Sequence, residues 1–174
     1  MNDRFAWYDI VDGRDLEQGD ILESCPIYLP AESDAGTGRL KFRWEERDVI
    51  VLSQSCDLVE GREKVTDVLL ASVWKRSELT EGYLASPKGM EDARRGNLPG
   101  VHMLAACEMM GMEAEVRIVD FRRICTLPIT HLRDQILTKR KRLRLLPPYR
   151  EHLSQSFARF FMRVGLPVDI PAFR

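Results

Sequence analysis

The stretch DVIVLSQSCDL, residues 48 to 58, decides how the fold is interpreted. Its four consecutive apolar residues, Val49 to Leu52, are typical of a strand that is covered on both faces. The small and polar residues that follow can bond their own backbone and end such a strand. We therefore expect a central strand whose end presents a group of polar side chains beside a loop, where functional groups often gather. These are Ser53, Gln54, Cys56 and Asp57.

Length and composition indicate one globular domain. The chain has 174 residues, of which 44% are hydrophobic and 30% are charged, so a core of ordinary size can form. Its four cysteines form no CxxC pair, and no signal-like apolar segment follows the first residues. We expect a reduced, cytoplasmic protein without a membrane segment, because no apolar run is long enough to cross a bilayer.

Charge is distributed unevenly along the chain. Residues 1 to 130 carry 16 Lys and Arg against 24 Asp and Glu, whereas residues 131 to 174 carry 10 against 3. Such a basic segment either folds back on the acidic part or meets an acidic partner such as nucleic acid. The basic run at its centre would contact phosphates or form a solvated helix face. That run is Lys139, Arg140, Lys141 and Arg142.

Short strands in series, followed by helices, predict a mainly β fold with a C-terminal α part. We expect a small SH3-like barrel over residues 1–125, with an N-terminal lead-in, and a basic two-helix extension over 126–174 that packs on it. The expected helices are Pro128 to Leu146 and Tyr149 to Val164, and Trp74 to Gly100 is expected to be an exposed loop with a possible short helix. The expected strands lie within residues 19–29, 39–44, 48–52, 67–73, 101–106 and 115–121.

The segment from Arg39 to Trp44 alternates without error. Leu40, Phe42 and Trp44 would share one face of a strand. The three cations Arg39, Lys41 and Arg43 would share the other face, where they either guard an edge strand against aggregation or bind RNA phosphates.

Metal and cysteine chemistry have little support in the residue spacing. The side chains suited to zinc match no compact ligand pattern, so we expect neither a metal nor a cofactor. These side chains are Cys25, Cys56, Asp57, His102 and His131. Cys56 as a nucleophile would need a neighbouring base and an activating environment.

Four segments together resemble the MazF/PemK-like toxin superfamily. They are Gln18 to Ile21, Arg47 to Ser53, Val68 to Val73 and Val116 to Ile124. The resemblance implies a PemK-like barrel, spans roughly residues 18 to 145, and rests on the order and spacing of short pieces. The phrase LSQSCDL also resembles a motif of uncharacterised bacterial proteins, which brings no established chemistry.

The resemblance implies certain catalytic residues. MazF-like toxins cleave single-stranded RNA without metal, using an arginine before the second of these strands and a hydroxyl residue at the end of the next one. Arg47 matches the arginine, but Trp74 stands at the hydroxyl position, with Ser72 two residues earlier on the same strand face. From the chemistry of such cleavage, rather than from the resemblance, we expect Arg47 to stabilise the developing charge, Ser53 or Ser72 to orient the phosphate, and His102 to shuttle a proton.

Two functions follow from this resemblance. The first is an RNA- or protein-binding module of a prokaryotic stress, defence or toxin-antitoxin-type system, without efficient catalysis. The alternative is an active, metal-independent and sequence-specific endoribonuclease. We expect single-stranded RNA or a cognate protein as partner, a homodimer, and no contact with membranes. The departures at Trp74 and at Asp48, where the family has proline, favour the binding module.

Overall fold

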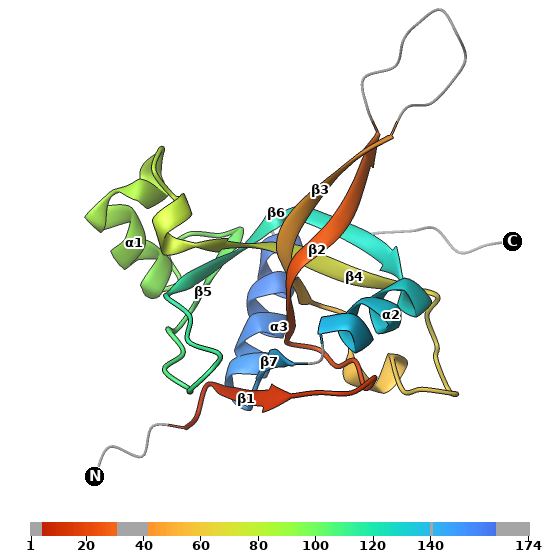
Figure 1. Ribbon diagram of the computed structural model, residues 1–174. Helices are drawn as coiled ribbons and strands as arrows, with labels where there is room; N and C mark the ends of the chain where they lie inside the picture. The colour runs from red at the N-terminus through yellow and green to blue at the C-terminus, as the bar shows by residue number, and fades with distance from the viewer. Residues whose placement is uncertain (1–4, 31–41, 140, 163–174) are drawn as a thin grey trace, which may run out of the picture.

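A computed structural model describes residues 5–30, 42–139 and 141–162. Within this part of the chain, seven strands form one antiparallel sheet in the order β1-β7-β2-β3-β4-β6-β5 (Figure 1). The strands are β1 (Tyr8–Val11), β2 (Asp20–Pro30), β3 (Phe42–Val51), β4 (Asp67–Lys75), β5 (Val101–Leu104), β6 (Arg117–Pro128) and β7 (Arg142–Leu145). The α-helices are α1 (Pro87–Arg94), α2 (Ile129–Lys139) and α3 (Tyr149–Phe161). The expected mainly β fold with a C-terminal helix is confirmed.

The central strand is β3, and its apolar end is buried on both faces. Val49, Ile50 and Val51 are each 0% exposed, as their unbroken apolar run predicts. Ile50 belongs to one core cluster, with Leu153 of α3. Val49 and Val51 belong to the other, with Leu132 of α2. The sheet thus separates two cores, and one C-terminal helix packs against each.

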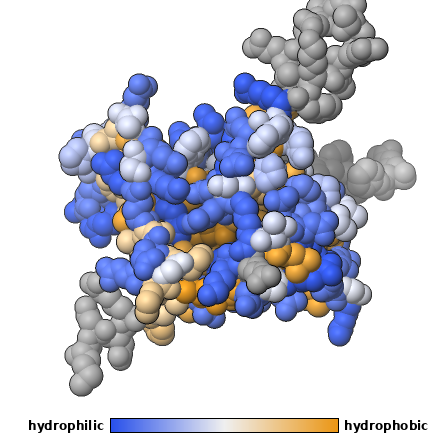
Figure 2. Space-filling view, viewed as in Figure 1, coloured by the Kyte–Doolittle hydropathy of each residue, from blue (hydrophilic) through white to orange (hydrophobic). Residues whose placement is uncertain are grey.

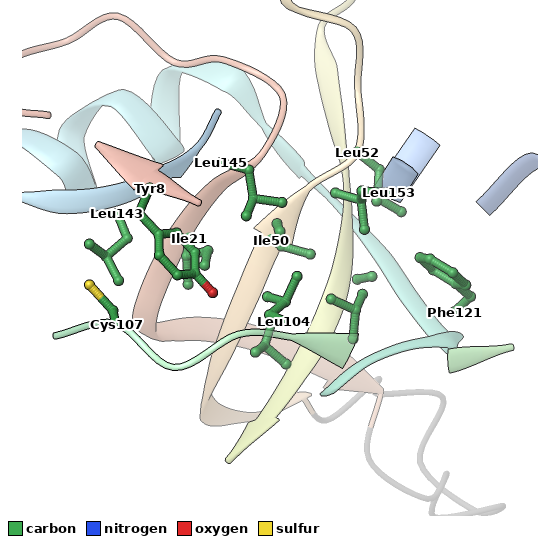
Figure 3. Close-up of a cluster of buried hydrophobic side chains, with 13 residues drawn as sticks. Tyr8, Ile21, Ile50, Leu52, Leu104, Cys107, Phe121, Leu143, Leu145 and Leu153 are labelled. Carbon is green, nitrogen blue, oxygen red and sulfur yellow. The ribbon is translucent and has the colours of Figure 1, made fainter. Parts of the chain in front are cut away.

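The predicted helix from Pro128 to Leu146 is wrong in its second half. The helix α2 ends at Lys139, and residues 142–145 form β7 between β1 and β2. Leu143 and Leu145 enter the same core as Tyr8 and Ile21, as Figure 3 shows. The alternation of leucine and arginine in this segment is the period-two pattern of a strand. The predicted helix after Pro147-Pro148 is confirmed as α3.

The arginines of β7 fold back on the acidic N-terminal part. Asp20 is 0% exposed and accepts hydrogen bonds from Arg142 Nε at 2.7 Å and from Arg144 Nε at 2.5 Å. Arg144 also donates to Glu17 Oε1 at 2.5 Å. For Arg142 and Arg144, the basic segment therefore folds back on the acidic N-terminal part, and their charges are neutralised within the chain.

A bulge in β2 sets the direction of a two-stranded arm. The register between β2 and β3 shifts between Leu22 and Cys25, and Ser24 adopts a positive φ of 46°. Lys139 of α2 donates to the carbonyl oxygens of Glu23 and Ser24 at this bulge, which fixes it. Beyond the bulge, β2 and the first half of β3 pair with each other and rise away from the body (Figure 1).

The arm corrects two predictions. Strand β3 runs without a break from Phe42 to Val51, so there is no turn between the two strands expected there. Trp44 is 62% exposed rather than packed on a core, because it lies on the arm, opposite the exposed Tyr28 on β2. Leu40 lies outside the described residues.

The segment between β4 and β5 is more ordered than predicted. It contains α1, which starts at Pro87 and is capped by Ser86, whose Oγ accepts the Gly89 N–H at 3.0 Å. Gly89 is buried against the backbone of Tyr83, so closely that a Cβ there would lie 1.9 Å from the Tyr83 carbonyl oxygen, and only glycine fits. The helix packs beside β5 around Ala93 and Val101.

The two edges of the sheet approach each other without pairing as strands. Tyr8 of β1 donates its hydroxyl to the carbonyl oxygen of Ala105, just after β5, at 2.6 Å. Burial raises the pKa of this phenol to about 12, so it is a hydrogen-bond donor at neutral pH. Among the described helices, none combines the length and apolar character needed to span a bilayer.

Candidate binding cleft

A cleft opens where β3 and β4 part. Their register runs from Asp48 opposite Val73 to Val51 opposite Leu70 and goes no further within the described residues. In Figure 1 the arm then rises from the body, whereas β4 continues toward α1. The resulting hollow has a volume of about 410 Å³. Its lining comes from residues 45–48 of β3, residues 72–75 of β4, Ser24 and Glu78.

Two predicted catalytic residues, Arg47 and Ser72, line this cleft together. Arg47, however, forms an ion pair with Glu45, and Ser72 is only 2% exposed. A guanidinium that already has a carboxylate partner is less available to stabilise a phosphorane-like transition state. Asp48, where MazF-like toxins have proline, accepts the Ser24 N–H at 2.8 Å and lies 3.8 Å from Lys75 Nζ. The bulge therefore supports one wall of the cleft.

An aromatic platform extends the cleft. Trp74 and Glu78 also line a second hollow of about 480 Å³, so the two hollows are contiguous. The Arg123 guanidinium lies over the Trp74 ring, 5.3 Å from its centroid. Beside it, Asp120 is held by Arg122 through Nε at 2.8 Å. The indole is therefore partly exposed between the two hollows, with one of its faces covered by the Arg123 guanidinium.

The polar residues of LSQSCDL hold their own loop instead of meeting Arg47. Ser53 Oγ accepts the Leu69 N–H at 2.8 Å, and Ser55 Oγ accepts the Gln18 N–H at 3.1 Å. Gln18 Nε2 donates to the Leu52 carbonyl oxygen at 2.8 Å. Ser53 lies six residues beyond Arg47 along an extended chain, which separates them by roughly 20 Å. The motif thus has a structural role at the end of β3.

The rest of this motif faces solvent near α3. Gln54 and Cys56 are exposed, and with Ser154 they line a hollow of about 390 Å³. Cys56 Sγ lies 3.5 Å from Asp57 Oδ1, and Asp57 pairs with Lys64 at 3.1 Å. No histidine is recorded in contact with the Cys56 thiol within the described part of the chain, so a thiol-imidazole pair finds no support here.

His102 lies away from the cleft. It is on β5, and its Nδ1 forms a hydrogen bond with Ser156 Oγ of α3 at 3.1 Å. Burial, with a smaller contribution from His152, lowers the pKa of His102 to about 4. A weakly basic imidazole beneath a helix is poorly suited to accept a proton from a ribose hydroxyl. The predicted catalytic set of Arg47, Ser53, Ser72 and His102 is not assembled at one place.

The predicted RNA-binding cations have different surroundings. Arg43 is exposed on the arm, and Lys141 is exposed just before β7. Lys139 is bonded to the bulge carbonyls, and Arg142 is 4% exposed and paired with Asp20. Arg39, Lys41 and Arg140 lie outside the described residues. Lys139 and Arg142 therefore serve the fold, because their polar groups are already bonded within the chain.

A further hollow of about 300 Å³ lies beside the bulge, lined by Ile21, Met112, Ile136 and neighbouring polar residues. Figure 2 shows that the visible face is largely hydrophilic, with apolar residues toward its centre and lower part. The Glu23 carboxylate at this hollow already accepts from the buried Arg117 at 3.1 Å. Across the described part of the chain, no group of three or more His, Cys, Asp or Glu is placed to hold a metal ion.

The cleft includes residues that the sequence analysis did not select for the site. Lys75, Glu78 and Arg123 each lie at or beyond the end of a predicted strand. Their convergence depends on where β3 and β4 part, which no local pattern predicts. The one sequence feature that marked this part of the cleft is Trp74, which stands where MazF-like toxins have a hydroxyl residue. No protein-family model, no curated protein and no solved structure matches this chain.

Proposed function

We propose that the chain is a protein-binding module of a prokaryotic stress, defence or toxin-antitoxin-type system, built on a MazF-like scaffold and without efficient catalysis. The supporting observation is the cleft between β3 and β4. It joins an aromatic platform, Trp74, to a wall with both signs of charge, whereas the residues proposed for cleavage are dispersed or already paired. Interfaces are enriched in such aromatic and arginine anchors.

Charge favours a protein over RNA as the partner. Four carboxylates line the cleft, from Glu45, Glu46, Asp48 and Glu78, against the cations of Arg47 and Lys75. A single-stranded RNA would bring a row of phosphates against this excess of negative charge, which opposes binding. A polypeptide segment with cationic side chains meets no such opposition.

The barrel assignment is part of the same proposal. A MazF-like scaffold requires the curled sheet to behave as a small SH3-like barrel, with β1 and β5 as the edges that meet. The hydrogen bond from Tyr8 to Ala105 across these edges supports this arrangement.

The test uses a library of random peptides displayed on phage. Selection is run against the wild-type protein, against Trp74→Ala, and against Phe5→Ala as the control, since Phe5 is an aromatic residue that is 68% exposed and lies outside the lining of the cleft. We expect the wild type and Phe5→Ala to enrich the same peptide consensus, and Trp74→Ala to lose it. Circular dichroism melting of each variant establishes that it is folded.

The alternative is tested in parallel, because Arg47 and Ser72 do share the cleft. The wild type and Arg47→Ala are incubated with a mixed RNA pool, and the ends of the RNA are mapped. We expect the same end pattern for both proteins. Cleavage at one short sequence that disappears in Arg47→Ala would overturn the proposal in favour of an endoribonuclease.

A further inference from the structure

The free edge of β3 has a defined hydrogen-bonding phase. The Val51 carbonyl oxygen accepts the Gly19 N–H on the β2 side, whereas the Leu52 N–H donates to Leu69 on the β4 side. Backbone groups of successive strand residues point to opposite sides, so odd-numbered residues of β3 face β2 and even-numbered ones face away from it. The register between β2 and β3 is continuous from Cys25 to the end of the arm, so this phase extends along it.

The phase leaves two residues with unpaired backbone groups at the cleft. Trp44 and Glu46 are even-numbered, and within the described residues no strand pairs with β3 at these positions on the side away from β2. Pro26, which lacks an N–H, lies opposite Glu46. Proline is tolerated there because the backbone N–H and C=O groups of Glu46 point away from β2. Among the described residues, two N–H and two C=O groups along one side of the arm therefore have no partner strand.

Chemistry at this edge identifies the kind of occupant. Glu45, Glu46 and Glu78 all contribute carboxylates to the lining of the cleft. A second copy of this edge would set glutamate against glutamate, which is unfavourable between neighbouring strands. A strand with lysine or arginine side chains is complementary to the carboxylates of this wall.

We propose that the partner of this module is a protein with a basic, extended segment, and that this segment adds as a β-strand to the edge of β3 at Trp44 and Glu46. Main-chain hydrogen bonds supply the register, and the carboxylates of the cleft supply the preference for cations. This inference rests on the proposed function and specifies how the cleft would perform it.

The test uses hydrogen exchange of the protein's own amides. The probe is a ten-residue peptide of alternating lysine and threonine, acetylated and amidated, added at saturating concentration to ¹⁵N-labelled full-length protein. We expect exchange at the Trp44 and Glu46 amides to slow by at least roughly tenfold. The Glu45 and Arg47 amides are the internal control, because they already face β2 and should change by less than about twofold.

A charge-matched series tests the side-chain part. The double variant Glu46→Gln, Glu78→Gln should weaken peptide binding by about tenfold, whereas Glu60→Gln, on the exposed loop after LSQSCDL, should leave it unchanged. A peptide with glutamate in place of lysine should not bind.

Each failure has its own meaning. Binding that depends on Trp74 while the Trp44 and Glu46 amides exchange as before would overturn strand addition and leave the proposed function standing. No binding by this peptide or by any library peptide, together with tight binding of an oligouridylate, would overturn both.

Discussion

The substitution Asp20→Asn tests whether the buried charge network holds β7 in the sheet. Asp20 is 0% exposed, and its two carboxylate oxygens accept three hydrogen bonds from Arg142 and Arg144 at 2.5 to 2.9 Å. Asparagine has a similar size but no charge, and its amide would point a donor at a guanidinium. Arg142, only 4% exposed, would then lose its counter-ion.

The expected loss is large because one partner of a buried ion pair is removed. Breaking such a pair costs about 3–5 kcal/mol, a substantial part of the roughly 5–15 kcal/mol by which proteins of this kind are stable. Equilibrium urea unfolding of wild type and variant, followed by circular dichroism, measures the difference. The mass of the chain and its far-ultraviolet spectrum establish that the variant starts from the same fold.

The matched control is Glu17→Gln. Glu17 pairs with Arg144 at 2.5 Å and Arg150 at 3.3 Å, but its side chain is 35% exposed. Its loss should cost less than about 1 kcal/mol, because exposed ion pairs contribute little. A loss of less than about 1 kcal/mol for Asp20→Asn, with an unchanged slope against urea, would refute the reasoning that this network holds β7.

Three further predictions concern single residues. The pKa of His102 in the folded protein is about 4, below its value of about 6.5 in the unfolded chain. Its contribution to the free energy of unfolding is therefore fully present above pH 6.5, and about 3 kcal/mol is lost as the pH falls toward 4. Denaturant unfolding across this range should show a smaller loss for His102→Gln. Gly19→Ala should lower the melting temperature by several degrees, because φ is 86° and a Cβ would lie 3.0 Å from that of Leu145; an unchanged melting curve would contradict this close approach. Cys56 is exposed and should react with a thiol reagent in the native protein, whereas Cys25, buried with its pKa raised to about 11, should react only after unfolding; peptide mass spectrometry identifies the labelled thiol.

Local pattern was enough to predict the centre of the fold. The unbroken apolar run from Val49 to Leu52 predicts a strand that is buried on both faces, and the aromatic stripe that begins at Tyr149 predicts a helix. In both segments the apolar pattern itself indicates which side chains are buried. The same reasoning failed for residues 142–145. Lysine and arginine are good helix formers, and the reason for a strand there is the buried carboxylate of Asp20, more than a hundred residues earlier.

The arm and the site show a second limit of sequence reasoning. Trp44 fits the alternating pattern of a strand, but the sequence of β3 does not reveal whether a core packs against the face on which it lies. Arg47 and Ser53 belong to one of the matched segments, but Arg47 lies within β3 and Ser53 lies beyond the end of that strand. Ser72 and Arg47 were predicted to act together, and they do share a cleft, because Ser72 on β4 lies opposite Val49, two residues after Arg47 on the neighbouring strand.

The position of β7 between β1 and β2 affects how the chain must be made. During translation, β2 is complete at residue 30, whereas β7 begins only at residue 142. The strands β1 and β2 therefore lack the strand that lies between them while about 110 further residues are synthesised. At about 5–20 residues per second this delay lasts roughly 5 to 20 seconds. During that time the apolar side chains of Tyr8 and Ile21 lack the leucines that later cover them. The nascent chain therefore completes this sheet only after residues 142–145 have been synthesised.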